Sequence, residues 1–228
     1  MTSYNGEAFI EKQIRSILPQ LSQADELIIG DDCSGDRSVE IIESIADPRI
    51  TLYKNEKNGG LNRNISQILS RSRGDYIFLC DQDDIWLPGK VHCCLYSLKT
   101  DDLVIHNAIF IDQNDNPLNE TTFQRFFPSS SYLNNLISNK YIGACMAFRR
   151  TLLTPLLPLG DNIPMHDWYI AQHALRYGKK IKTERKELIL YRRHRGNLSA
   201  TAEGKSTASL FTKLKWRYDI LRKTFFYN

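Results

Sequence analysis

Short apolar runs and amphipathic segments alternate through the first 80 residues, and this alternation constrains the fold more than any other feature of the chain. Consecutive apolar residues predict buried strands, whereas apolar residues that recur every three or four positions predict helices. Strands separated by such helices imply right-handed crossovers and a mostly parallel sheet. This half is therefore predicted to be a Rossmann-like α/β unit. The expected strands are residues 26–30, 50–53 and 75–80, and the expected helices are residues 7–21, 36–46 and 61–70.

The second half of the chain is less regular. Residues 112–131 are rich in Asn, Asp, Pro and Ser, a composition typical of long loops that bind or move. No internal repeat and no convincing linker divides the chain, so residues 1–200 are interpreted as one domain. The remaining expected elements are helices at residues 88–98 and 167–177 and strands at residues 103–111, 144–148 and 181–190.

The composition is that of an ordinary globular protein. Of 228 residues, 42% are hydrophobic and 25% are charged, and no run approaches the roughly 18 apolar residues that span a bilayer. The first residues lack the basic flank and apolar stretch of a signal peptide, which predicts a cytoplasmic protein. The five cysteines form no C-x-x-C pair, so reduced and mostly buried thiols are expected.

The net charge of +4 conceals an excess of positive charge near the C-terminus. Residues 176–228 contain fifteen Lys and Arg against four Asp and Glu, a balance of +11, and the rest of the chain balances at −7. No helix-turn-helix or RNA-binding signature accompanies this charge, so no nucleic-acid partner is expected. Residues 201–228 are expected to form a basic amphipathic helix whose apolar face carries Leu210, Leu214, Tyr218, Leu221 and Phe225.

Two interpretations of this helix remain open. It either lies on an anionic membrane surface, which would make the protein peripheral on the inner face of the cell membrane, or packs on the domain with its basic face in water. Charge alone does not decide between them.

Acidic residues follow two of the expected strands directly. Asp31 and Asp32 come after the first strand, and Asp81, Asp83 and Asp84 come after the third. Ligands of open α/β sheets bind at such strand ends, and carboxylates gathered there repel one another unless a cation compensates them. A hard divalent metal shared with substrate phosphates would do so. An isolated D-x-D is more often a solvated turn or a helix N-cap, but two clusters favour a phosphate and metal site.

Six short segments form an ordered series of motifs: TSYNG at residues 2–6, DDCS at 31–34, DQDDIWLP at 81–88, GACMAFRR at 143–150, MHDW at 165–168 and LYRRHRGN at 190–197. They resemble the motifs of family-two glycosyltransferases, in particular the bacterial branch that builds surface polysaccharides and has rhamnosyltransferase-like members. Each motif alone is weak, whereas their order and spacing are specific. The resemblance implies the GT-A fold, a Rossmann-like, mixed, mostly parallel sheet flanked by helices, with a nucleotide-binding half at about residues 1–88 and an acceptor half at about residues 89–200.

The resemblance also assigns the residues that hold the donor. Thr2, Tyr4 and Asp32 would hold the nucleotide base and ribose, since a carboxylate accepts from the N3–H of uracil or thymine. Asp81 would reach the ribose, and Asp81 and Asp83 would bind Mn²⁺ or Mg²⁺ bridging the diphosphate. A metal there neutralises the charge that develops on the leaving group.

The MHDW segment resembles the place where the family has its general base. Asp167 would take the proton from the acceptor hydroxyl, and a single base without a covalent intermediate implies inversion at the anomeric carbon. Trp168 would stack on a sugar, and His166 and Gly143 would shape the acceptor site. Asp167 also suits the N-cap of the helix that follows, and the two interpretations are compatible.

The basic segment of the last motif resembles a Tyr-Arg-x-His patch of the family. Arg192 and Arg193 would contact the diphosphate through their planar guanidinium groups. His194 is either a metal ligand or a surface histidine. Arg63, in a turn that contains two glycines, is a further expected donor contact.

The resemblance implies an inverting, metal-dependent glycosyltransferase. It would transfer a sugar from a UDP- or dTDP-sugar, such as dTDP-rhamnose, to a saccharide or lipid-linked acceptor in cell-surface polysaccharide synthesis. The alternative is a non-catalytic, membrane-associated nucleotide-binding module of the same fold. One departure favours the alternative: the central first strand would be nearly absent, unless the true start lies upstream. Cys33, which replaces a glycine usual in the second motif, is a milder departure. The intact Asp81, Asp83 and Asp167 favour the enzyme.

Overall fold

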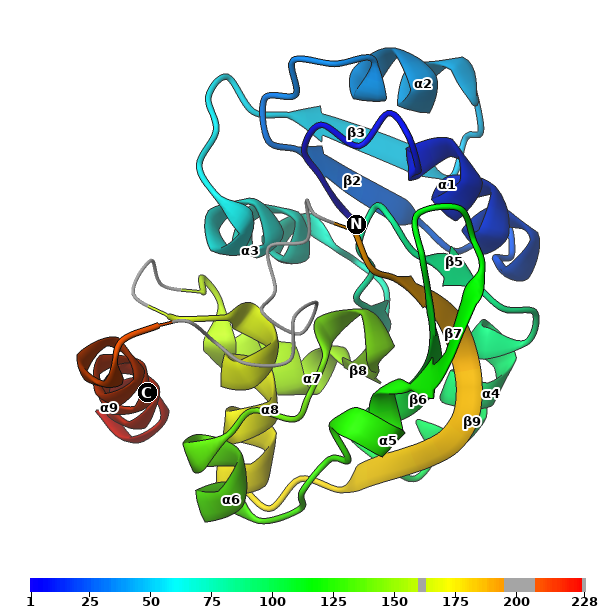
Figure 1. The fold of residues 1–228 in the computed structure, drawn as a ribbon. Helices are drawn as coiled ribbons and strands as arrows, with labels where there is room; N and C mark the ends of the chain where they lie inside the picture. The colour runs from blue at the N-terminus through cyan, green and yellow to red at the C-terminus, as the bar shows by residue number, and fades with distance from the viewer. Residues whose placement is uncertain (160–162, 195–207, 227–228) are drawn as a thin grey trace.

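Two β-sheets and the helices around them make up the computed structural model, which describes residues 1–159, 163–194 and 208–226 (Figure 1). The first sheet contains β1 (Thr2–Ser3), β2 (Leu27–Asp31) and β3 (Ile50–Lys54), and its helices are α1 (Ile10–Ile17), α2 (Ser38–Ser44) and α3 (Leu61–Arg71). The strands lie in the order β1-β2-β3 and run parallel, as predicted. A 3₁₀ turn, η1 (Leu18–Gln20), extends α1.

The helices of this half bury the apolar positions that predicted them. Ile10, Ile14 and Ile17 of α1 are at most 1% exposed, and Ile65 and Ile68 of α3 are also buried. This spacing places each set on one helix face, and its burial against the sheet stabilises both layers. The elements predicted for residues 1–80 are therefore confirmed, with shifts of a few residues at their ends. The strand predicted at residues 75–80, however, is β4 (Tyr76–Phe78), which lies in the second sheet and pairs antiparallel with its neighbour there.

The second sheet has six strands in the described residues. Its strands are β4 (Tyr76–Phe78), β5 (Ile85–Trp86), β6 (Leu103–Ile111), β7 (Pro117–Thr121), β8 (Met146–Arg149) and β9 (Ile181–Arg192), and its order is β4-β8-β6-β9-β5 with β7 also paired to β6. Of these pairs only β6 and β9 run parallel. The mostly parallel arrangement expected from the sequence therefore holds for the first sheet and not for the second. Short connections such as the turn between β6 and β7 force antiparallel neighbours, because a parallel pair needs a long crossover.

The remaining helices surround this sheet. They are α4 (Lys90–Ser97), α5 (Thr122–Arg125), α6 (Tyr132–Ile137), α7 (Arg150–Leu153), α8 (His166–Arg176) and α9 (Leu210–Phe226), with the 3₁₀ turns η2 (Gly143–Cys145) and η3 (Thr154–Leu156). Figure 1 shows α8 beside α9, with α6 next to both.

The prediction of a long loop at residues 112–131 is wrong. Asp112 Oδ1 accepts hydrogen bonds from the backbone N–H groups of Asn114 and Asn116, and the resulting turn folds β7 back onto β6. Thr121 and Gln124 then form a reciprocal capping box at the start of α5. The polar residues that indicated a loop are thus turn and cap residues of short elements.

The first strand is short, as predicted. β1 has two residues, and the amino group of Met1 donates to the carbonyl oxygen of Ile28 at 2.7 Å. Beside Met1, an apolar groove of about 820 Å³ is lined by residues of β2 and β4. The two sheets are consequently not joined into one at this point.

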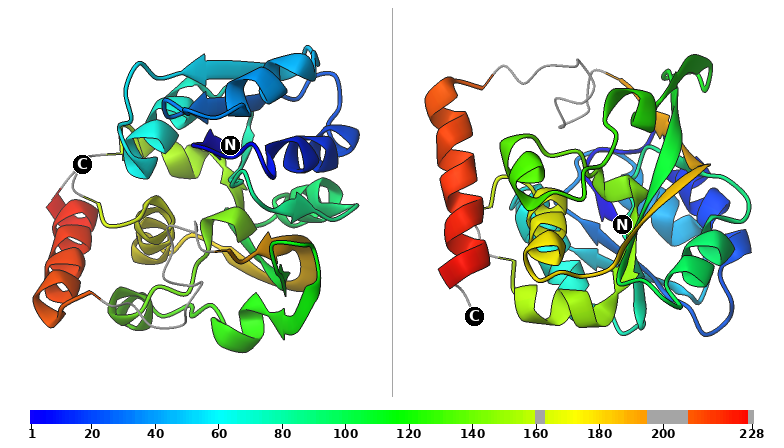
Figure 2. Two further views of the ribbon diagram at one scale, coloured as in Figure 1. Left: turned by 45° about the horizontal axis from the view of Figure 1, so that its top comes forward. Right: turned by 90° about the horizontal axis from the view of Figure 1, so that it is seen from below.

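The C-terminal helix stands at the edge of the molecule, as the two views of Figure 2 show. α9 begins at Leu210, so the predicted boundary at residue 200 lies outside the described residues. Ile220 and Thr224 pack inward, whereas four of the five residues predicted to form the apolar face, Leu210, Leu214, Tyr218 and Phe225, are exposed. None of the helices that the structure describes is both long and apolar enough to cross a membrane.

Candidate active site

A cleft of about 870 Å³ lies where the carboxyl ends of β1, β2 and β4 approach the start of α8. Asp81 and Asp83 reach it from the segment after β4, and Asp167 reaches it from the first turn of α8. The chemistry predicted from the sequence requires these carboxylates to share one cleft. The other residues that the sequence singled out and that line this cleft are Thr2, Tyr4, Asp32, Arg63, Gly143, His166 and His194.

Negative charge is concentrated in the segment after β4. Burial, together with the charges of Asp83 and Asp167, raises the pKa of Asp81 to about 7. Burial and the charge of Asp83 also raise the pKa of Asp84 well above its ordinary value. Asp84 is 2% exposed, and its Oδ2 has no hydrogen-bond partner among the described residues. The cluster therefore has more negative charge than its surroundings compensate.

One buried cation lies close behind these carboxylates. Lys90 is fully buried, its Nζ donates to the carbonyl oxygen of Ala144 at 2.9 Å, and it lies 4.2 Å from the centroid of the Trp86 ring. Its charge acts to lower the pKa values of Asp81 and Asp84, yet both remain raised. The amino group of Met1 also acts to lower the pKa of Asp81. Compensation by these two cations is incomplete, and a bound cation would relieve the remaining repulsion.

The residues present fit a divalent metal. Nε2 of His194 lies 2.8 Å from Oδ2 of Asp83, and the two rings of Phe9 and His194 are 5.0 Å apart, so His194 is not a surface histidine. In the described residues no group of three or more His, Cys, Asp or Glu forms a ready cage. This donor set suits a metal held by one or two carboxylates and completed by substrate phosphates, as Mg²⁺ usually is.

Asp167 is held by three donors. Its Oδ2 accepts from the backbone N–H of Gly143 at 3.1 Å, and its Oδ1 accepts from the backbone N–H of Trp168 at 2.5 Å and from Nδ2 of Asn139 at 3.3 Å. Burial nevertheless raises the pKa of Asp167. A fixed carboxylate whose proton affinity is increased is well suited to accept a proton at neutral pH.

His166 and Gly143 lie against this carboxylate. A Cβ atom on Gly143 would stand 2.9 Å from Nε2 of His166 and 3.5 Å from Cβ of Asp167, so only glycine allows this approach. Burial lowers the pKa of His166, which keeps its imidazole neutral, and its buried Nδ1 has no partner among the described residues. A polar atom left unpaired beside the base is suited to a ligand contact.

Asp32 organises the loop that follows β3. Its Oδ1 accepts from Nδ2 of Asn55 and the N–H of Gly59, both at 2.9 Å, and its Oδ2 accepts from the N–H of Gly60 at 2.8 Å. The loop leads into α3, whose first turn holds Arg63 in place of the turn expected there, and Arg63 is exposed and lines the cleft. Asp32 thus shapes this wall of the cleft in addition to lining it.

Tyr4 is fixed by its backbone and leaves its ring in the cleft. Its N–H donates to Oε1 of Gln82 at 2.9 Å, and its carbonyl accepts from Nε2 of the same side chain at 3.0 Å. Tyr4 is 47% exposed and Thr2 lies beside it in the lining. An exposed aromatic ring in a cleft is suited to stack on a planar group such as a nucleotide base.

The sugar contact predicted for Trp168 is wrong. Trp168 is 7% exposed and does not line the cleft, and its indole N–H donates to the carbonyl of Asn135 at 3.0 Å. Successive residues of a helix point about 100° apart, and because His166 and Asp167 face the cleft, Trp168 is turned toward Asn135 of α6.

The direct diphosphate contact predicted for Arg192 and Arg193 is also wrong, because neither lines the cleft. Arg192 is 1% exposed, and its guanidinium donates to the carbonyls of Asp83 and Asp112 at 2.7 and 3.0 Å and pairs with Asp115. Arg193 lies over the ring of Phe110, with 3.9 Å between its Nη1 and Oε2 of Glu120. Arg192 therefore braces the segment that carries Asp83.

Two positioning residues were missed by the sequence analysis. Gln82 ties the Asp81–Asp83 segment to Tyr4, and Asn139 donates to Asp167. The position of Gln82 inside the acidic motif was a usable signal, whereas nothing in the local pattern around Asn139 marks it. Further lining residues that were not foreseen are Phe126, Tyr141, Ile142, Met165 and Tyr191.

Comparison with known proteins agrees with this geometry. Residues 1–156 match the model of the family described as glycosyl transferase family 2. The chain belongs to this family. Its relatives include the dTDP-rhamnosyl transferase RfbG of Shigella flexneri, 28% identical, with the match covering 86% of this chain and 72% of RfbG. The glucosyltransferase WfgD of Escherichia coli, whose name gives α-D-GlcNAc-diphosphoundecaprenol as acceptor, is 30% identical, over 68% of this chain and 60% of WfgD.

Solved structures of GT-A glycosyltransferases share the fold. Staphylococcus aureus TarS in complex with UDP-GlcNAc superposes with a TM-score of 0.70 at 15% identity, over 98% of this chain and 63% of the TarS chain. The mannosyltransferase PcManGT of Pyrobaculum calidifontis, in complex with GDP-Man and Mn²⁺, gives a TM-score of 0.63 at 16% identity, over 98% of this chain and 68% of that chain. The predicted GT-A fold is confirmed. The chain is a family-two glycosyltransferase of the kind found in surface polysaccharide synthesis.

Proposed function

We propose that this glycosyltransferase is inverting and metal-dependent. It transfers a sugar from a UDP- or dTDP-sugar to a saccharide or lipid-linked acceptor of a cell-surface polysaccharide. The observation that carries the proposal is the convergence of Asp81, Asp83 and Asp167 on one cleft. The cytoplasmic location expected from the sequence stays a prediction.

Asp167 serves as the general base. Its carboxylate takes the proton from the acceptor hydroxyl while that oxygen attacks the anomeric carbon and the nucleotide diphosphate leaves. Gly143 and Asn139 hold the carboxylate in place for this transfer, and the neutral His166 lies beside it in the lining of the cleft. With one base and no nucleophilic side chain in the step, the product has inverted configuration.

Asp81, Asp83 and His194 would hold the divalent metal. When bound, the metal compensates the charge of the diphosphate as it departs. The carboxylates themselves fix the position of the donor relative to Asp167, and the raised pKa of Asp81 supports the need for a cation in this place.

The nucleotide and sugar are proposed from the relatives. Tyr4, Thr2 and Asp32 would form the base and ribose pocket, with Arg63 at its rim. RfbG is named as a dTDP-rhamnosyl transferase, which makes dTDP-rhamnose the first donor to test, and WfgD is named for UDP-Glc. The lipid-linked acceptor follows from the name of WfgD.

A thermal-shift titration of UDP and dTDP, with Mn²⁺ or with a chelator, tests the donor site. At a nucleotide concentration of about 100 times Kd, binding raises the melting temperature of a chain of this size by roughly 5–10 °C. We expect that shift only with the metal. An equal shift in the presence of the chelator would contradict the metal-bridged site.

Transfer itself needs a separate measurement. A panel of nucleotide sugars is incubated with the protein and Mn²⁺, and hydrolysis or transfer is followed by mass spectrometry. We expect one nucleotide sugar to be turned over preferentially. Tight metal-dependent nucleotide binding without turnover of any sugar would favour the non-catalytic alternative.

A further inference from the structure

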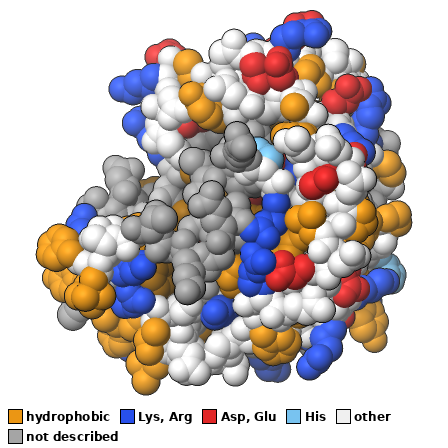
Figure 3. Space-filling model, in the orientation of Figure 1, with side chains coloured by type: hydrophobic (Ala, Val, Ile, Leu, Met, Phe, Trp, Pro, Cys, Tyr) orange, Lys and Arg blue, Asp and Glu red, His pale blue; other side chains and the backbone are white. Residues whose placement is uncertain are grey.

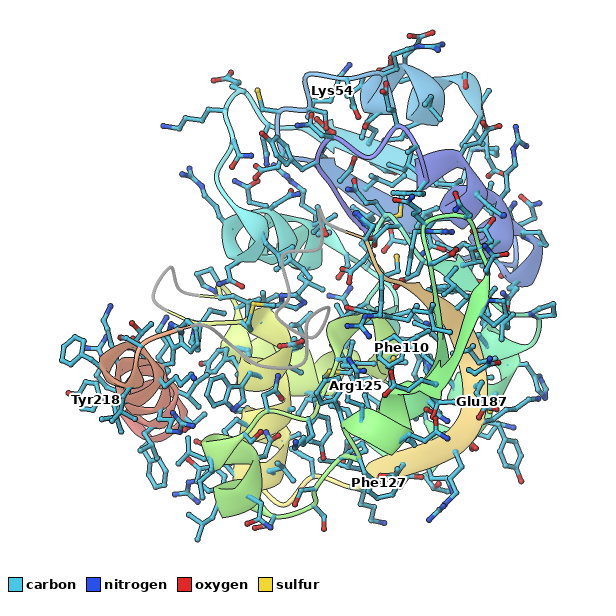
Figure 4. The ribbon with its side chains drawn as sticks, viewed as in Figure 1. Lys54, Phe110, Arg125, Phe127, Glu187 and Tyr218 are labelled. Atoms are coloured by element: carbon cyan, nitrogen blue, oxygen red, sulfur yellow. The ribbon has the colours of Figure 1, made fainter. Side chains whose placement is uncertain are left out.

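The outer side of α9 is apolar and largely exposed, although Phe225 at its end contacts Tyr132 and Arg176 of the domain. Leu210 is 74% exposed, Leu214 is 56% and Tyr218 is 63%, and Phe211 and Phe225 are exposed as well. At about 100° per residue, Leu210, Leu214, Tyr218 and Phe225 fall within roughly a quarter of the helix circumference. Figure 4 shows Tyr218 on the side of α9 that faces away from α8.

A different side of the same helix holds it on the domain. Ile220 and Thr224 are buried and Trp216 is partly buried, and the hydroxyls of Thr224 and Tyr132 lie 3.3 Å apart. The exposed apolar side is therefore separate from the side by which α9 packs on the domain. α9 has two apolar sides, and the domain uses only one of them.

Helix α6 extends the exposed surface. Leu133 and Ile137 are 65% and 62% exposed, and Arg217 of α9 donates to the carbonyl of Ile137. Figure 3 shows hydrophobic side chains gathered over α9 and α6, next to Lys and Arg. Contiguous exposed apolar surface of this kind marks an interaction site. We call it the α9–α6 surface, defined as Leu133, Ile137, Leu210, Phe211, Leu214, Tyr218 and Phe225.

The charges around the α9–α6 surface indicate which class of partner it binds. By helical spacing, Lys215 and Arg222 flank the apolar side of α9 on one edge and Arg217 lies near the other, whereas Lys213 and Asp219 point away from it. A second copy docked through the same face would bring like charges together, which disfavours a dimer. An apolar strip bordered by cations complements a layer of anionic head groups above acyl chains.

We propose that the α9–α6 surface binds anionic phospholipid membranes, with Leu214 and Tyr218 entering the head-group region and Lys215 pairing with lipid phosphates. The proposal does not depend on the transfer reaction, because vesicle binding requires neither donor nor metal. It gives the enzyme a position at the membrane, where a lipid-linked acceptor would be presented.

Co-sedimentation of the full chain with vesicles tests this surface. Vesicles of phosphatidylglycerol and phosphatidylethanolamine are compared with vesicles of phosphatidylcholine, in the absence of nucleotide. We expect binding to the anionic vesicles that weakens as NaCl rises from about 0.1 M to about 0.5 M. The double variant Leu214→Ser/Tyr218→Ser is expected to lower the partition coefficient about tenfold or more, and Lys215→Glu is expected to lower it for anionic vesicles only.

The chain supplies a matched control. Tyr96→Ser/Leu118→Ser removes a tyrosine and a leucine that are 68% and 43% exposed on α4 and β7, away from α9. This control is expected to bind like the unaltered protein, and circular dichroism confirms that both double variants fold. Equal binding by both double variants, or no binding to anionic vesicles by the unaltered chain, overturns the proposal. A dimer in solution that only the Leu214→Ser/Tyr218→Ser variant loses would assign the surface to a second copy instead.

Discussion

Replacing Asp81 by asparagine removes the carboxylate at the centre of the acidic cluster. The side chain is partly buried, and burial with the charges of Asp83 and Asp167 raises its pKa from 3.8 to about 7. A carboxyl shifted in this direction favours the folded state only while it is protonated. Its contribution is complete below pH 3.8, the value for the unfolded chain, and is lost as the pH rises through about 7.

The magnitude follows from the same shift. At about 1.4 kcal/mol per pH unit, ionised Asp81 opposes folding by something on the order of 4 kcal/mol above pH 7. In metal-free buffer, Asp81→Asn should therefore match the unaltered protein at about pH 4 and exceed its free energy of unfolding by up to that amount at about pH 8. Adding Mn²⁺ at pH 8 should stabilise the unaltered protein and leave the variant almost unchanged.

Urea unfolding followed by circular dichroism, at several pH values and with a chelator, measures this difference. Asp75→Asn is the control, because Asp75 is exposed and does not line the cleft. An Asp81→Asn variant no more stable than the unaltered protein at pH 8 would refute the reasoning. It would show that the cluster is already compensated without a metal.

Three further substitutions test the roles assigned to the cleft. Asp167→Asn should lower kcat by about 10²–10⁴-fold with donor Kd unchanged, measured by transfer assay and calorimetry; unchanged turnover would exclude Asp167 as the base. Asp83→Ala should abolish the gain in donor affinity caused by Mn²⁺ in calorimetric titrations, and a metal effect that persists would exclude Asp83 as a ligand. Gly143→Ala should lower kcat/KM for the acceptor by about tenfold or more, because its Cβ would press on His166, with donor binding retained; an unchanged value would show that His166 moves aside at no cost.

Local patterns were enough to predict the first half of the fold. The apolar spacing of Ile10, Ile14 and Ile17 fixes a helix face, and burial of that face against the sheet follows from the hydrophobic effect alone. The second sheet was harder, because strand direction there depends on connections such as the Asp112 turn. The side-chain hydrogen bonds of Asp112 stabilise a tight turn between two strands, whereas the polar composition of residues 112–131 indicates a long loop.

The sequence predicted those cleft-lining residues that directly follow a strand or stand in the first turn of a helix. Asp81 and Asp167 occupy such positions, and both line the cleft. Arg192 occupies a similar position at the end of β9 but turns inward, because the carbonyls of Asp83 and Asp112 and the carboxylate of Asp115 compensate its charge there. Sequence spacing locates the end of a strand but does not give the direction of the side chain there. An arginine that contacts a phosphate therefore cannot be distinguished from one that binds carbonyl groups of the protein itself.

The two walls of the cleft belong to different sheets, which share one hydrophobic core and are also joined by long-range hydrogen bonds. Gln82 pairs in both directions with the backbone of Tyr4, and the buried Gln13 donates from Nε2 to the carbonyl of Asp81 at 2.8 Å. These bonds join residues 68 and 78 positions apart, a separation at which helical or strand periodicity gives no information. We therefore expect Gln82→Ala to weaken donor binding and metal binding together in calorimetric titrations, although Gln82 is neither a ligand of the metal nor a base.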